Sequence, residues 1–302
     1  MGIMTVTDEL RARLGRVGIW MPPPERIGVD PAGVAVAIEN AGFTSVWEGG
    51  GNPDQAALDR IKAQLATTTS LIAATGIASV WTWDPAVLRA AAQDLESAFP
   101  GRFILGLGVS HAPAVEALGH AYERPLRKLE KFLDELSHPA GHGAERPLPP
   151  VVLAALGPMA LGLARDQALG THPYFTTPEH TRFAREVLGP SPLVIPELAF
   201  TLASPAEGAA TARAYASRYL RLPNYTNNLK NFGFGPGDLE GTGSDRLIAE
   251  VIPNGPEALC ERIQAHLDAG ADHVVIQPLG DGVFTAAALT ALAETTGDFL
   301  KH

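Results

Sequence analysis

The feature that most constrains the fold is a repeated unit, in which a short apolar run is followed by a proline that opens a helical pattern. Six residues stand directly before such a proline: Asp30, Asn52, Asp84, Gly157, Thr177 and Ser204. Proline is favoured at the first position of a helix because its φ is already helical and its missing N–H would be unpaired there anyway. Each pair therefore predicts that a helix starts soon after a strand.

The apolar runs predict eight strands, each followed by a helix. They cover residues 16–20, 44–47, 71–81, 103–109, 151–156, 171–175, 193–200 and 273–277. Eight such units in 302 residues predict an α/β fold, a parallel (β/α)8 TIM barrel forming a single domain over residues 1–302. A Rossmann fold is the alternative, but His111 replaces the third glycine of its fingerprint, which also lies far from the first strand.

Residues 221–255 interrupt this rhythm between the seventh and eighth predicted strands. The segment is rich in asparagine, glycine and aromatic residues, including Tyr225. Connections of this length in a compact domain are usually functional or disordered. The composition predicts an insertion that acts as a lid or an interface, followed by an extra helix near residues 256–269.

Composition excludes several function classes. The formal net charge is −10 and no cluster of lysine and arginine is present, which argues against a nucleic-acid partner. The single cysteine, Cys260, excludes an internal disulfide and any cysteine-rich metal site. No apolar run reaches membrane-spanning length and the polar start does not resemble a signal peptide, so we expect a cytoplasmic protein without a membrane partner.

The carboxyl ends of the predicted strands carry the candidate chemistry, because active sites of such barrels form there. These positions are Trp20, Glu48, Trp81, Ser110, His111, Leu156, Gly157, His172, Glu197 and Gln277. They include no metal-ligand spacing and no nucleophile elbow, so no metal site is expected. Aromatic walls with a few proton-transfer groups suit a flat, conjugated ligand.

Most of these residues also have a structural interpretation. Trp20 and Trp81 are typical core residues, and Glu197 lies in an apolar run where a structural hydrogen bond explains it equally well. His172 precedes a proline and fits an ordinary loop histidine. Glu48 fits a residue that caps the following glycine turn.

The turn after the fifth predicted strand is the best phosphate-binding candidate. It consists of Ala155, Leu156, Gly157, Pro158 and Met159. It joins a strand to a helix N-terminus, where free N–H groups and the helix dipole favour an anion. An ordinary strand-to-helix turn is the alternative.

Several stretches resemble the bacterial luciferase-like superfamily, and within it the coenzyme F420-dependent oxidoreductases. The most specific are residues 74–80, 101–113, 171–180, 222–229 and 269–274. The resemblance extends over nearly the whole chain. It implies an enzyme that transfers a hydride between the deazaflavin coenzyme F420 and a small organic substrate.

The resemblance also implies roles for individual residues. Ser79, Val80 and Trp81 would back the cofactor ring, with a cis peptide bond at Ser79-Val80. Ser110 would border the ring, and residues 155–159 would hold the phosphate. For proton transfer, His111 is the first choice and His172 the second. Substrate contacts would come from Trp20, Glu48, Glu197 and Tyr225.

One departure from the family keeps alternatives open. Many relatives carry an acidic residue and a histidine at the end of strand two, where this chain has Gly49, Gly50 and Gly51 after Glu48. An FMN-dependent monooxygenase and a non-catalytic barrel that binds a flavin-like ligand are therefore alternatives. NAD(P) is disfavoured because the glycine fingerprint fails at His111. The family also implies a homodimer that pairs through helices of the early units.

Overall fold

The computed structural model describes residues 6–23, 27–49, 55–138 and 146–300. Their strands form one sheet in the order β8-β7-β6-β5-β3-β2-β1-β10-β9, with β4 pairing beside β5. Every pair is parallel. The strands are β1 Val17–Met21, β2 Ser45–Glu48, β3 Ile72–Thr75, β4 Ala78–Ser79, β5 Phe103–Gly108, β6 Val151–Leu153, β7 Gly170–Thr171, β8 Leu193–Val194, β9 Glu197–Phe200 and β10 Val274–Pro278.

The sheet closes on itself through residues 193–200. On one side, the N–H of Ile195 bonds to the Thr171 carbonyl and the N–H of Glu197 to the Pro173 carbonyl. On the other side, the N–H of Val275 bonds to the Pro196 carbonyl. The two end strands of the order, β8 and β9, are thus parts of one extended segment. The predicted TIM barrel is confirmed, with residues 193–200 as its seventh strand.

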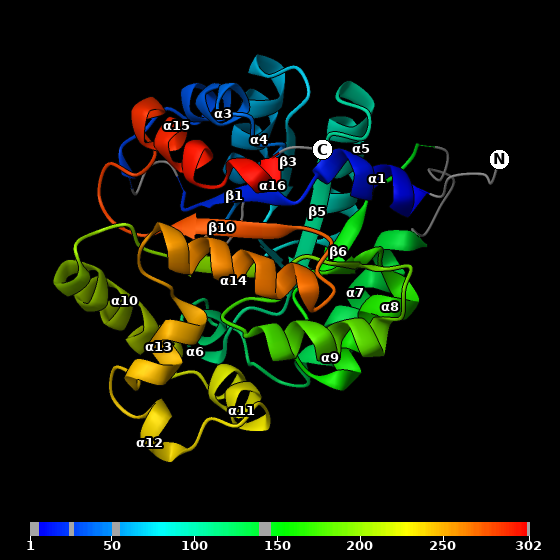
Figure 1. The fold of residues 1–302 in the computed structure, drawn as a ribbon. Coiled ribbons are helices and arrows are strands. Elements are labelled where there is room, and N and C mark those ends of the chain that lie inside the picture. The colour runs from blue at the N-terminus through cyan, green and yellow to red at the C-terminus, as the bar shows by residue number, and fades with distance from the viewer. Residues whose placement is uncertain (1–5, 24–26, 50–54, 139–145, 301–302) are drawn as a thin grey trace.

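Helices surround the barrel, and Figure 1 shows β1 and β10 side by side inside them with α14 alongside. The main surrounding helices are α3 Pro31–Asn40, α4 Gln55–Thr67, α5 Pro85–Ala98, α7 Pro125–Ser137, α8 Pro158–Gln167, α9 Pro178–Leu188, α10 Pro205–Tyr219, α14 Pro256–Asp268 and α15 Ala286–Thr295. Shorter or terminal ones are α1 Val6–Leu14, α6 Ala112–Glu116 and α16 Gly297–Leu300.

The predicted proline starts are confirmed wherever the structure describes them. Helices α3, α5, α8, α9 and α10 each have proline in the first turn. Asp30 also caps α3 by accepting a hydrogen bond from Gly33, and Asp84 caps α5 in the same way. Asn52 lies outside the described residues.

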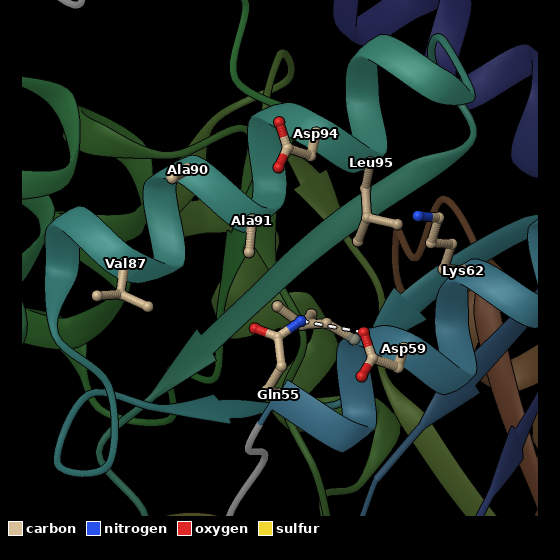
Figure 2. Close-up of a pocket in the computed structure, with 9 residues that line it drawn as sticks. Gln55, Asp59, Lys62, Val87, Ala90, Ala91, Asp94 and Leu95 are labelled. Atoms are coloured by element: carbon tan, nitrogen blue, oxygen red, sulfur yellow. Dashed lines mark hydrogen bonds between the residues drawn. The ribbon is translucent and has the colours of Figure 1, made fainter.

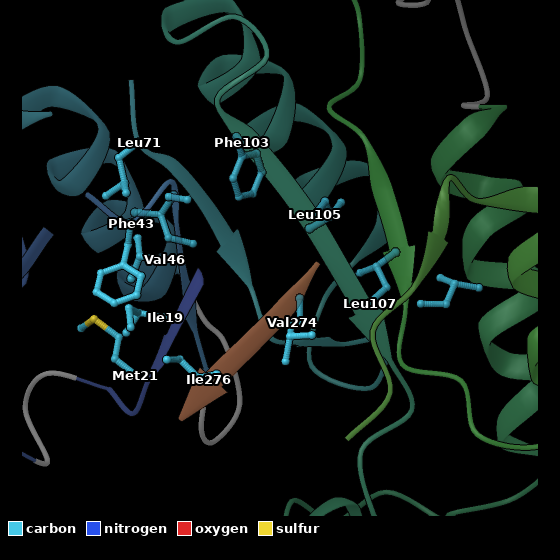
Figure 3. Close-up of a cluster of buried hydrophobic side chains, with 14 of the residues drawn as sticks. Ile19, Met21, Phe43, Val46, Leu71, Phe103, Leu105, Leu107, Val274 and Ile276 are labelled. Atoms are coloured by element: carbon cyan, nitrogen blue, oxygen red, sulfur yellow. The ribbon is translucent and has the colours of Figure 1, made fainter. Parts of the chain in front are cut away.

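The main core lies between the strands and the surrounding helices. Figure 3 shows side chains of this layer, from Ile19 and Met21 on β1 to Phe103 on β5 and Ile276 on β10. A smaller cluster fills the barrel interior and contains Trp47 and Val275. The strands are apolar on both faces because each face is covered, which explains their continuous apolar runs.

Residues 221–255 are mainly helical rather than a long open loop. They form α11 Pro223–Asn231, α12 Pro236–Leu239 and α13 Asp245–Val251. Their apolar side chains pack with those of α10 in a separate buried cluster. Figure 1 shows α10 to α13 together at one end of the barrel. Prolines at the first positions of α11 and α12 and the Ser244 cap of α13 supply the helix starts. A lid role remains a prediction.

Within the described part of the chain, no helix is long and apolar enough to cross a membrane.

Candidate active site

A cavity of about 700 Å3 opens at the carboxyl ends of the strands. Its lining comes from the segments that follow most of the barrel strands. Residues that line the cavity include Trp20 in β1, Ile77 after β3, Ser110 after β5, Leu156 after β6, His172 after β7, Glu197 in β9 and Gln277 in β10. The cavity therefore occupies the position where barrels of this type place their sites.

His172 and Glu197 form a buried pair at this cavity. Their exposed side-chain fractions are 2% and 5%, and His172 Nε2 lies 3.6 Å from Glu197 Oε2. His172 Nδ1 lies 2.8 Å from the Ile195 carbonyl oxygen. A carbonyl only accepts, so Nδ1 carries the proton and Nε2 is left as an acceptor. Neither Nε2 of His172 nor Oε1 of Glu197 has a hydrogen-bond partner among the described residues.

Burial disfavours the charged form of both members of the pair. Burial raises the pKa of the Glu197 carboxyl well above its usual range. Burial also lowers the pKa of His172 to about 4, although the hydrogen bond to Ile195 works in the other direction. A carboxyl group whose neutral form burial favours thus lies beside an imidazole lone pair, and such a pair can hold and release one proton.

A polar chain inside the barrel fixes the ring of His172. The ring stacks on Trp47 with centroids 4.4 Å apart. Trp47 Nε1 donates to Ser45 Oγ at 3.1 Å, and Ser45 Oγ lies 2.8 Å from His273 Nε2. These contacts hold the indole, and through it the imidazole, in one orientation.

Tyrosine dominates the rest of the lining. All five tyrosines of the chain line this cavity: Tyr122, Tyr174, Tyr215, Tyr219 and Tyr225. Tyr215 donates to Gln277 Oε1 at 2.6 Å, Tyr219 donates to the Tyr215 oxygen at 3.2 Å, and Tyr174 also donates to Tyr215. Burial raises the pKa of Tyr174 and Tyr215 well above the usual range, so these hydroxyls stay protonated.

His111 and Ser110 lie on another wall of the same cavity. The His111 ring is 5.4 Å from Tyr225, and its buried Nδ1 has no partner among the described residues. Burial lowers the pKa of His111. Ser110 has φ +55° and accepts at its carbonyl from the Tyr122 hydroxyl at 3.3 Å. The structure thus brings His111, His172, Glu197, Tyr225 and Ser110 to one cavity.

Most of the predicted phosphate turn reaches the cavity. Leu156, Gly157, Pro158 and Met159 line it, whereas Ala155 is fully buried in the core beneath. The first intrahelical bond of α8 runs from Leu161 to the Gly157 carbonyl, so the N–H groups of Met159 and Ala160 precede it. His180 donates through Nε2 to the Leu156 carbonyl at 2.9 Å and braces the turn. No side chain caps the helix here.

The cavity wall at strand three differs from the prediction. Gly76 and Ile77 line the cavity, and the cis peptide bond lies at Gly76-Ile77, so its predicted position at Ser79-Val80 is wrong. Ser79 pairs with Gly108 of β5, and Val80 is buried in the main core. The strand resumes as β4 after the bend at Gly76, which turns these residues away. Trp81 instead backs Tyr122, with ring centroids 5.6 Å apart.

Two other predicted substrate contacts have different outcomes. Trp20 lines the cavity, and its Nε1–H donates to the Gly76 carbonyl at 3.3 Å. Glu48 does not line it. Its carboxylate accepts from Arg60 at 2.6 Å and from Gln64 at 3.1 Å, both on α4. The side chain of Glu48 thus faces outward to the helix layer, and its contacts are structural.

Sequence reasoning missed Tyr122, Tyr174, Tyr215 and Tyr219. A signal was available for two of them, because Tyr215 and Tyr219 are four residues apart and must share one face of α10. Tyr174 belongs to a short irregular segment after β7, and Tyr122 to a loop before α7. No periodicity predicts where such loop residues point.

A second hollow, of about 300 Å3, lies in the outer layer between α4 and α5 (Figure 2). Gln55 and Asp59 bond to each other there at 3.1 Å, and Val87 lies on the opposite helix. None of its described lining residues has a buried polar atom without a partner. We assign it no chemistry. Among the described residues, no group of three histidine, cysteine, aspartate or glutamate side chains is placed to hold a metal ion.

A family comparison gives the cavity its context. The profile of the luciferase-like monooxygenase family matches residues 30–235, which is more than half of the chain. The chain belongs to this family. Comparison with curated protein sequences finds no match.

Solved structures resemble this luciferase-like chain in fold. An F420-dependent secondary alcohol dehydrogenase in complex with an F420–acetone adduct has a TM-score of 0.70 at 14% identity, covering 95% of this chain and 99% of that one. The coenzyme F420-dependent tetrahydromethanopterin reductase from Methanopyrus kandleri has 0.69 at 14%, covering 95% and 99%.

An FMN complex belongs to the same group. The oxygenating constituent of 3,6-diketocamphane monooxygenase from Pseudomonas putida has a TM-score of 0.69 at 15% identity, covering 93% of this chain and 96% of that one. The group thus includes proteins that bind F420 and one that binds FMN. Such low identities show the shared fold alone.

Proposed function

We propose that this protein is an oxidoreductase that transfers a hydride between coenzyme F420 and a small organic substrate. The observation that carries the proposal is that one cavity joins the turn at Gly157, which opens helix α8, to the buried His172–Glu197 pair. Family membership supports the reaction class, and F420-dependent enzymes among the fold relatives support the cofactor.

The residues present fit a deazaflavin with a phosphorylated side chain. The N–H groups of Met159 and Ala160 would receive the phosphate, and a Cβ added to Gly157 would meet nothing within 4 Å, so the backbone is open to a ligand. Ile77, Gly76 and Trp20 would contact the ring. When bound, the cofactor supplies the hydride-accepting or hydride-donating carbon.

The chain's own groups would manage the proton that accompanies the hydride. Burial favours the protonated form of the Glu197 carboxyl group, and His172 Nε2 is an acceptor 3.6 Å away. His111 provides a second imidazole in the lining of the same cavity. The tyrosine walls exclude water from the reacting atoms.

The acidic tail of F420 requires a cation near the cavity, since the chain carries a net charge of −10. Arg218 meets this requirement: its exposed guanidinium lies at the cavity edge, 5.9 Å from the Tyr215 ring centre. Arg218 therefore supports F420 over FMN, because the phosphate of FMN would need only the turn at Gly157.

Equilibrium binding of purified protein to F420 and to FMN tests the cofactor. We expect F420 to bind more tightly than FMN, and reduced F420 to be oxidised when a substrate is present. Tight FMN binding without detectable F420 binding would instead indicate a flavin monooxygenase. F420 binding without turnover over a broad substrate panel would indicate a non-catalytic binding barrel.

We also propose a cytoplasmic homodimer that pairs through helices of the early units. The resemblance to the luciferase-like family supports it. Sedimentation at micromolar concentration should give a dimer, and cell fractionation should place it in the cytoplasmic fraction. A monomer at that concentration would contradict the pairing.

A further inference from the structure

The inner end of the cavity has aromatic walls on several sides. Tyr174 meets Tyr219 edge to face at a centroid distance of 4.9 Å, and Tyr219 meets Tyr225 at 5.3 Å. Ring faces and edges of this kind favour flat, conjugated ligands. Lysine and aspartate are absent from the described lining, and Arg218 is exposed at the edge.

Three of the tyrosine hydroxyls leave little hydrogen-bonding capacity for a ligand. Those of Tyr174, Tyr215 and Tyr219 bond to one another and to Gln277 Oε1. Among the described lining residues, the buried polar atoms without a partner are Oε1 of Glu197, Nε2 of His172 and, beside Tyr225, Nδ1 of His111. Leaving such atoms unpaired is costly, so a bound molecule is expected to supply the partner.

The chemistry of Glu197 and His172 determines which group of a bound molecule can pair with them. Glu197 is packed among phenols and an imidazole whose pKa burial also lowers, so no described cation stabilises its carboxylate. This enclosed environment favours the protonated carboxyl group, which is a donor and would pair with an acceptor oxygen. A ligand carboxylate would bring an uncompensated charge into the same enclosed space.

We propose that the tyrosine-lined end of the cavity binds an uncharged, conjugated carbonyl compound, whose oxygen accepts a hydrogen bond from the carboxyl group of Glu197. This proposal names the substrate class of the proposed oxidoreductase. The catalytic role of the bound compound rests on that proposed function. The binding itself does not depend on which cofactor is present.

A matched series of naphthalene probes tests the class by isothermal titration calorimetry at pH 7. The probes are 2-acetylnaphthalene, 2-naphthoate, 2-(aminomethyl)naphthalene and naphthalene, which differ in charge and in the acceptor oxygen. We expect 2-acetylnaphthalene to bind about tenfold more tightly than each of the others, which is the effect of one hydrogen bond in a buried site. Equal or tighter binding of 2-naphthoate would overturn the proposal.

Two substitutions at Glu197 sharpen the test. Glu197→Gln keeps an N–H donor and should retain the preference for the ketone within about twofold, whereas Glu197→Leu should abolish it while leaving naphthalene binding intact. Glu135→Gln, on the outer side of α7 and paired with Lys131, is the matched control. A ketone preference that survives in Glu197→Leu would refute the role of the carboxyl group.

An infrared measurement addresses the donor directly and does not require a foldable Leu variant. The wild-type protein at pH 7 should show the carbonyl stretch of a protonated carboxylic acid, and this band should disappear in Glu197→Gln. Identical spectra would overturn the proposal. All titrations are run with and without F420, and F420 binding is measured separately, so failure of the cofactor proposal remains distinguishable from failure of this one.

Discussion

The indole ring of Trp20 occupies the space that a side chain at position 49 would need. A Cβ built on Gly49 would overlap that ring and would lie 2.6 Å from the Gly76 carbonyl oxygen. Trp20 is held there by its hydrogen bond to the same carbonyl. The glycine at the end of strand two, where many luciferase-like relatives carry a histidine, is therefore required by the packing of this chain.

Gly49→Ala should consequently destabilise the protein, because even a methyl group must displace Trp20 or Gly76. Overpacking of this kind costs about 1–3 kcal/mol, which thermal or urea unfolding will measure. Gly162→Ala on α8 is the control, since a Cβ there meets nothing within 4 Å. An unchanged unfolding midpoint for Gly49→Ala would show that Trp20 moves freely.

Gly157→Val should weaken cofactor binding without unfolding the barrel. The residue has φ −86°, which valine adopts readily, and nothing lies within 4 Å of its Cβ position. The added side chain would occupy the approach to the N–H groups of α8. We expect a rise in the F420 dissociation constant of about tenfold, equivalent to one lost hydrogen bond to a charged group.

Gly162→Val on the same helix serves as the control for the Gly157 substitution. Its Cβ position is also open, but the residue does not line the cavity. Unchanged F420 affinity in a folded Gly157→Val protein would remove the turn from the cofactor site.

His266 should contribute to acid sensitivity. Burial lowers its pKa to about 3, with Arg262 and His180 adding to the effect. The unfolded chain, with an ordinary histidine pKa near 6.5, binds the proton more readily. Stability from this residue is complete above about pH 6.5 and is lost as the pH falls towards 3.

His266→Gln should therefore flatten the dependence of unfolding free energy on pH between 6 and 4 by up to about 1.4 kcal/mol per pH unit. Urea unfolding at several pH values measures the slope, with His138→Gln at an exposed site as the matched control. A slope equal to that of the wild type would contradict the assignment.

Glu39 should support the entry to β3. Burial works against its charge, but N–H groups of Ser70, Thr69 and Leu71 donate to its carboxylate and lower its pKa to about 2. Its contribution is present above about pH 4.5 and is lost as the pH falls towards 2. Glu39→Gln should cost about 1–2 kcal/mol at pH 7 and less at pH 3. An equal cost at both pH values would show that charge is irrelevant.

Local signals were enough to predict the barrel. The prolines at helix starts act within one turn, and the apolar runs reflect burial on both faces, so neither depends on distant contacts. The apolar runs did not predict where a strand is interrupted. The run 71–81 divides into β3 and β4 at Gly76, and the run 193–200 divides at Pro196, because adjacent strands pair with the two halves separately.

The site was less predictable than the fold. Strand-end reasoning found Trp20, His111, His172 and Glu197 because strand ends converge in a barrel. The same reasoning placed the side chain of Glu48 in the cavity, whereas it points to the helix layer. Side-chain direction alternates along a strand and depends on the register of β2 with β1. The tyrosines of α10 and α11 reach the cavity through the packing of α10 against the inserted helices α11 to α13.

Residues 193–200 close the barrel and also carry Glu197 into the cavity. A descendant of this protein that lost its reaction would still need this backbone to keep the barrel shut. The backbone of position 197 would thus outlast the activity, whereas its buried carboxyl group, which makes none of the closing hydrogen bonds, could be replaced. Tyr215 and Tyr219 lie on a helix outside the closure, so a lineage that changes substrate can replace them first. Descendants that act on different substrates should therefore differ in the sequences of α10 and α11.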